Sequence, residues 1–119
     1  MSLNYRANSS VDDFECNSAG CDLLGSLHGA CGAEMEGPRV SPRGRVFDDR
    51  WTAPRAPYRA SADQAREMAT ALRSAGAEIW KSVLNGPWGD CWDGTAEEWV
   101  GHVQDWIDFL ESCDGYTAE

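Results

Sequence analysis

The chain has 119 residues and a formal net charge of −10. This length fits one domain, and no apolar run approaches the ~18 residues that a membrane-spanning helix needs. A chain this acidic repels phosphates, which disfavours direct nucleic-acid binding. We therefore expect a single domain over residues 1–119 that contacts neither membrane nor nucleic acid, with residues 1–10 frayed at the start.

The N-terminal residues and the five cysteines indicate the cellular compartment and its redox state. The N-terminal residues contain no apolar segment of the signal-peptide type, so we expect a cytoplasmic protein. In a reducing compartment, cysteines are mostly free thiols or metal ligands, and a disulfide framework is the less favoured interpretation.

The first third of the chain predicts short elements. Phe14-Glu15-Cys16 alternates as a strand does. Asn17 or Ser18 can cap a short helix that ends at Gly29 or Gly32. Residues 37–60 contain four of the five prolines and six arginines, so they are expected to form an irregular connection, with a short strand over 44–47.

A long helix is predicted after this connection. Ser61-Ala62-Asp63-Gln64 has the pattern of a capping box, and Asn85-Gly86-Pro87 is a strong stop signal. Apolar residues recur between them at helical spacing and form one stripe: Ala65, Met68, Leu72, Ala75 and Ile79.

The last helix is predicted over residues 95–114. Thr95-Ala96-Glu97-Glu98 is a second capping box. The inner stripe consists of Trp99, Val103, Trp106, Leu110 and Cys113. Gly115 suits a helix C-cap, and residues 116–118 are expected to return as a strand. Together the elements predict an α+β fold of two long amphipathic helices and one short helix, packed with a two- or three-stranded sheet; an all-α fold is the alternative.

A group of soft metal ligands lies near the N-terminus: Cys16, Cys21, His28 and Cys31. Four such ligands within sixteen residues could close a tetrahedral zinc site. In a continuous helix, however, Cys21 and His28 would lie two turns apart, about 10 Å, which is too far for one metal. We expect no cofactor, and a small zinc-binding module is the alternative.

No catalytic motif is recognisable. A nucleophile formed by Cys31 or Cys91 with His28 or His102 would also need an orienting group and an oxyanion site, and the sequence indicates neither. We therefore expect a protein that is not an enzyme.

The loop over residues 85–94 and the last helix carry the candidate partner-binding residues. Trp88 and Trp92 lie in this Gly-rich, acidic loop, where a tryptophan either plugs a gap between helices or anchors an interface. The outer face of the last helix is acidic. The predicted partner-binding residues are Trp88, Trp92, Glu97, Asp105, Asp108 and Glu111.

The charge pattern leaves two further hypotheses open. Residues 82–119 carry nine acids and no base, whereas residues 37–81 have a net charge of +4. The acidic face could imitate DNA phosphates, which would make the protein a DNA-mimic inhibitor. The Arg-rich connection could instead dock on this face, either within one chain or between the two copies of a homodimer.

Two stretches resemble small uncharacterised proteins of actinobacterial phages. The first is Phe14-Glu15-Cys16-Asn17-Ser18-Ala19-Gly20 followed by Leu23-Leu24-Gly25-Ser26-Leu27-His28-Gly29. The second is the ending Phe109-Leu110-Glu111-Ser112-Cys113-Asp114-Gly115-Tyr116. The resemblance implies an accessory protein of a phage or mobile element that binds a host or partner protein, and it implies no catalytic residues.

Overall fold

The structure is a computed structural model that describes residues 2–33, 59–86 and 89–118, without the side chains of residues 2–3 and 17–22. The elements, in chain order, are β1 (Ser2–Ala7), β2 (Phe14–Asn17), α1 (Ser18–Ala30), β3 (Arg59–Ser61), α2 (Ala62–Ala75), α3 (Ala77–Ser82), the 3-10 turns η1 (Val83–Asn85) and η2 (Gly89–Cys91), α4 (Ala96–Ser112) and β4 (Gly115–Ala118). The predicted α+β fold class is confirmed. The predicted strand over 44–47 lies outside the described residues.

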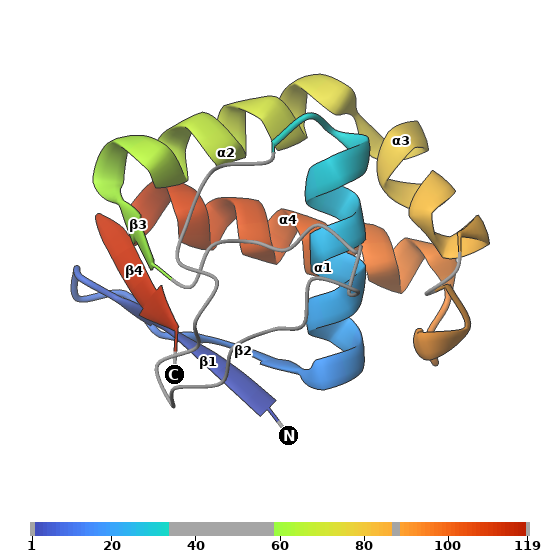
Figure 1. The fold of residues 1–119 in the computed structure, drawn as a ribbon, viewed down its shortest axis with the longest axis horizontal. Helices are drawn as coiled ribbons and strands as arrows, with labels where there is room; N and C mark the ends of the chain where they lie inside the picture. Colours follow the sequence, from blue (N-terminus) through green and yellow to red (C-terminus); the bar gives the residue numbers. More distant parts are fainter. Residues whose placement is uncertain (1, 34–58, 87–88, 119) are drawn as a thin grey trace, which may run out of the picture.

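The four strands form one antiparallel sheet in the order β2-β1-β4-β3. It is larger than the two or three strands expected, because β1 and β3 were not predicted. Figure 1 shows the sheet at the lower left, with the helices gathered above it. The fraying expected for residues 1–10 is wrong over β1, which is hydrogen-bonded to a strand on each side. Its Tyr5 pairs with Phe14 and Ala118 and is 2% exposed.

Alternate side chains of the strands enter the core. On the inner face, Tyr5 packs edge-on against Tyr116, with ring centroids 5.2 Å apart, and both rings are buried. The intervening residues Arg6, Glu15 and Arg59 are exposed. This period of two is the usual pattern of a sheet with one face on the core.

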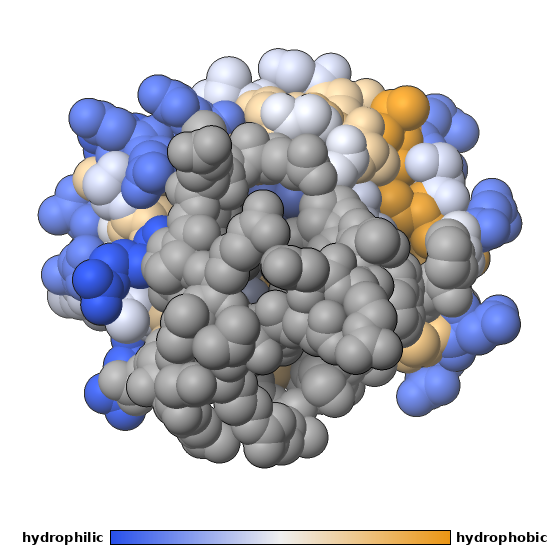
Figure 2. All heavy atoms as spheres, viewed as in Figure 1, coloured by the Kyte–Doolittle hydropathy of each residue, from blue (hydrophilic) through white to orange (hydrophobic). Residues whose placement is uncertain are grey.

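The predicted second helix is broken. Gly76 has a φ of +85°, which favours glycine, and it separates α2 from α3. The change of direction buries Trp80, whose Nε1–H donates to the Leu72 carbonyl at 2.8 Å, and leaves Ile79 40% exposed. Ile79 was predicted to lie on the same buried stripe as Leu72. Figure 2 shows a hydrophobic area over α3.

Helix α4 is central to the fold and begins with the predicted capping box. Its predicted inner stripe is confirmed: Trp99, Val103, Trp106, Leu110 and Cys113 are at most 1% exposed. After α4, Asp114 and Gly115 have positive φ values of 56° and 91°, and the chain turns directly into β4. No helix within residues 2–33, 59–86 and 89–118 is long and apolar enough to cross a membrane.

Candidate functional site

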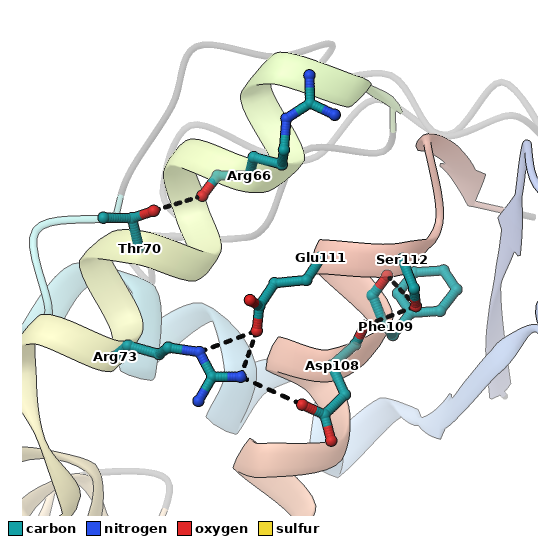
Figure 3. Close-up of polar contacts among 7 residues, drawn as sticks. All are labelled: Arg66, Thr70, Arg73, Asp108, Phe109, Glu111 and Ser112. Carbon is teal, nitrogen blue, oxygen red and sulfur yellow. Dashed lines mark hydrogen bonds and ion pairs between the residues drawn. The ribbon is translucent and has the colours of Figure 1, made fainter.

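The acidic face of α4 is partly neutralised by Arg73 of α2. The Nε atom of Arg73 donates to Glu111 Oε1 at 2.9 Å, and the Nη2 atom of Arg73 lies 3.3 Å from Asp108 Oδ1 (Figure 3). The hydrogen bond to Glu111 is the main reason why the pKa of Arg73 is raised. Two of the predicted partner-binding acids, Asp108 and Glu111, therefore already have a counter-charge.

The other two predicted acids of α4 remain uncompensated. Glu97 and Asp105 are exposed, and neither has an ion pair with another described residue. Glu97 lies in the first turn of α4, where a carboxylate is stabilised by the positive end of the helix dipole. Asp105 lies about two turns further along, close to His102.

Trp92 is held on the protein but remains half-exposed. Its Nε1–H donates to the Thr95 carbonyl at 3.0 Å, next to the start of α4. Its ring packs edge-on against the buried Trp99, at 5.2 Å between centroids. Trp92 thus partly plugs the space beside α4, as one interpretation of the loop expected, while part of its surface is left for contact with a partner. Trp88 lies outside the described residues.

His102 extends this contact to the sheet. Its ring lies 5.4 Å from Trp92 and 5.3 Å from Phe14 of β2, measured between centroids, and all three rings are half-buried. We call Trp92, His102 and Phe14 the aromatic row. The sequence indicated His102 only as a possible catalytic base. Its position between Trp99 and Asp105, at the edge of the apolar stripe, is the signal that could have indicated its place in the aromatic row.

The imidazole of His102 is incompletely hydrogen-bonded. Its Nε2 is buried and has no hydrogen-bond partner in the described part of the chain. Burial lowers the pKa of His102, while the nearby carboxylate of Asp105 opposes this shift. The ring is therefore neutral at pH 7.

His28 of α1 lies in the interior and is fully buried. The Trp106 Nε1–H can only donate, so His28 Nε2, at 3.0 Å, accepts this hydrogen bond. His28 Nδ1 lies 3.2 Å from the Ala33 carbonyl and must therefore carry the proton. Because burial lowers the pKa of His28 to about 4, the ring is neutral and both of its nitrogens are engaged.

These contacts bear on the zinc alternative. Neither nitrogen of His28 is free to bind a metal, and Cys16 is disulfide-bonded, so it offers no thiolate. Burial raises the pKa of the Cys31 thiol to about 11. The side chain of Cys21 lies outside the described residues. Free thiols are found at Cys31, Cys91 and Cys113, as the sequence favoured, whereas the disulfide at Cys16 departs from that expectation.

The predicted partner-binding residues thus divide into two groups. Asp108 and Glu111 face Arg73, whereas Trp92 and Asp105 lie at His102. No family model, curated protein or solved structure matches the chain. The function is therefore inferred from the arrangement of the side chains.

Proposed function

We propose that this chain is a non-enzymatic protein-binding module that contacts a host or partner protein through the aromatic row, the neighbouring Asp105 and the exposed Glu97. The observation that carries the proposal is a line of half-exposed rings that contains an imidazole nitrogen without a hydrogen-bond partner among the described residues. Large aromatic side chains at the surface are typical anchors of protein interfaces.

The state of His102 supports a role beyond packing. A buried polar atom without a partner destabilises a fold by about 1–3 kcal/mol. A leucine of similar size would fill the same space without that cost, so stability alone does not account for a histidine here. Asp105 supports the same conclusion, because it is an exposed carboxylate with no counter-charge among the described residues.

The resemblance to phage proteins supports an accessory role in which the partner is a host protein in the cytoplasm. The disulfide at Cys16 is instead typical of oxidising compartments. Alkylating the thiols at the moment of cell lysis distinguishes a reducing cytoplasm from an oxidising compartment. Five alkylated cysteines identify a reducing compartment, and three identify an oxidising one.

Affinity capture from host lysate tests the proposed function. Trp92→Ala and Asp105→Asn are compared with the wild type, and Trp88→Ala tests the other loop tryptophan. Because an interface tryptophan contributes about 2 kcal/mol or more, we expect Trp92→Ala to weaken capture roughly 30-fold.

The matched control is Asp108→Asn. It makes the same chemical change on the same helix, but at a carboxylate that Arg73 already neutralises. We expect this variant to capture the partner as the wild type does. Identical capture by the wild type and Trp92→Ala would contradict the proposed function, provided that circular dichroism shows both chains folded.

A further inference from the structure

We propose that the aromatic row receives the guanidinium group of an arginine on the partner protein, which stacks on the exposed rings and pairs with Asp105. This inference rests on the proposed function, and it specifies the chemistry that the partner must present.

The aromatic row is supported from beneath by fully buried rings. Trp99 lies 5.2 Å from Trp92 and 5.8 Å from His102, and Trp106 lies 5.0 Å from Phe14, measured between ring centroids. Trp99 and Trp106 are both 0% exposed. The exposed rings are therefore fixed in place by the core, so a ligand that stacks on them does not have to order them first.

The charges around the aromatic row favour a cation. Ring faces carry negative electrostatic potential, which attracts a cation placed over them. Asp105 adds a carboxylate that has no ion pair with another described residue. The carboxylate of Glu98, which accepts hydrogen bonds from Thr95 in the capping box, adds negative charge near Trp92: a β-carbon on Gly94 would lie 3.0 Å from Trp92 Nε1 and 3.1 Å from Glu98 Oε2. His102 does not oppose a cation, because burial lowers its pKa and keeps the ring neutral.

Arginine fits this surface better than lysine does. Its guanidinium is planar and weakly hydrated, so it can stack on a ring while its edge donates hydrogen bonds to a carboxylate. A lysine ammonium is compact and strongly hydrated, and it binds as a point charge. The aromatic row, with Asp105 beside it, offers both a stacking face and an acceptor.

The test uses three small probes and the whole chain. The probes are N-acetyl-arginine methylamide, its lysine counterpart, and the citrulline counterpart, which keeps the planar shape without the charge. Two-dimensional NMR follows the indole N–H signals of Trp92, Trp99 and Trp106. We expect arginine to cause a saturable shift of the Trp92 signal, lysine to bind at least threefold more weakly, and citrulline to cause no shift. Equal shifts with arginine and citrulline, or no shift with arginine, would overturn the inference.

A matched pair of variants locates the site. Asp105→Asn should weaken the arginine effect at least fivefold, whereas Asp108→Asn, whose carboxylate is already paired, should leave it unchanged. Unmoved Trp106 signals show that each variant is folded. If the two variants respond alike, Asp105 is not the acceptor and the inference is wrong.

Two further outcomes separate this inference from the proposed function. If partner capture depends on Trp92 but the arginine probe does not bind, the protein-binding function stands and the arginine inference fails. If the Trp92 signal shifts with protein concentration in the absence of any probe, the surface is occupied by a second copy of the chain, and the inference of an arginine on another protein is overturned.

Discussion

The two histidines have similar aromatic neighbours but differ in burial and in hydrogen bonding. Each lies beside a tryptophan of α4, His28 at 6.0 Å from Trp106 and His102 at 5.8 Å from Trp99 between ring centroids, and burial lowers the pKa of both. His28 has both nitrogens in hydrogen bonds, whereas Nε2 of His102 has no partner in the described part of the chain. Neighbouring rings therefore do not define the role of a histidine; its hydrogen bonds do.

Replacing His28 should have the largest effect. His28→Leu leaves the Trp106 indole N–H and the Ala33 carbonyl without partners inside the core. We expect the free energy of unfolding to fall by about 4 kcal/mol, because each buried group left unpaired costs about 1–3 kcal/mol. Urea denaturation followed by circular dichroism measures the change. A loss below about 1 kcal/mol would remove the distinction between the two histidines.

Acid should destabilise the protein through His28. Its pKa is about 4 in the folded state and near 6.5 when unfolded, so between these values the unfolded chain binds more protons. The full contribution of His28 to the free energy of unfolding, about 3 kcal/mol, is present above pH 6.5 and is lost as the pH falls towards 4. His102 contributes with the same sign, because its pKa is also lowered.

Denaturation at pH 7, 5.5 and 4 measures this dependence in the wild type and in His28→Leu. The variant should lack most of the loss that the wild type shows. Parallel pH profiles for the two proteins would mean that His28 does not stay neutral when the chain is folded.

Changing Gly89 should disturb the surroundings of His102, because Gly89 lies in the turn that leads to Trp92. A β-carbon at Gly89 would lie 1.7 Å from the Leu84 carbonyl oxygen, so Gly89→Ala must separate η1 from η2 and displace Trp92. We expect a loss of about 2 kcal/mol in the free energy of unfolding, as is typical of overpacking.

The matched control for Gly89→Ala is Gly101→Ala in α4. A β-carbon at Gly101 meets nothing within 4 Å. Alanine is the better helix former, so this variant should be stabilised by up to about 1 kcal/mol. If both variants lose stability equally, close packing at Gly89 is not the cause.

Replacing His102 should have the smallest effect and the opposite sign to that of His28. His102→Leu removes the unpaired nitrogen and keeps the apolar contacts, so we expect stability to be unchanged or raised by about 1 kcal/mol. The same variant should bind the partner more weakly. Urea denaturation and affinity capture, measured on one preparation, check both outcomes, and a destabilised His102→Leu would assign this residue to the structure alone.

Local sequence signals predicted much of the fold. Both capping boxes and the inner stripe of α4 are confirmed, because they depend on spacing within a single helix. The break at Gly76 was missed because an isolated glycine is compatible with a continuous helix. Strand β1 was missed although its residues alternate between polar and apolar as in a half-buried strand. Its pairing with β4, at the other end of the described chain, is not visible in local sequence.

The candidate site was predictable in part. Trp92 and Asp105 could be recognised as surface candidates from their residue types. The pairing of Arg73 with Asp108 and Glu111 depends on how α2 packs on α4, which spacing along the chain does not reveal. The link from His102 to Phe14 likewise joins a helix to a strand far away in the sequence.

The neighbouring position of β1 and β4 at the centre of the sheet has a consequence for synthesis. β1 leaves the ribosome before its partner β4, which is translated more than a hundred residues later. The contacts of Tyr5 with Ala118 and of Asn8 with the Gly115 carbonyl therefore form only after β4 has emerged. Closing so long a loop is slow. Until then β1 can pair only with β2, and a stop codon placed just before Gly115 should leave a product that proteases degrade.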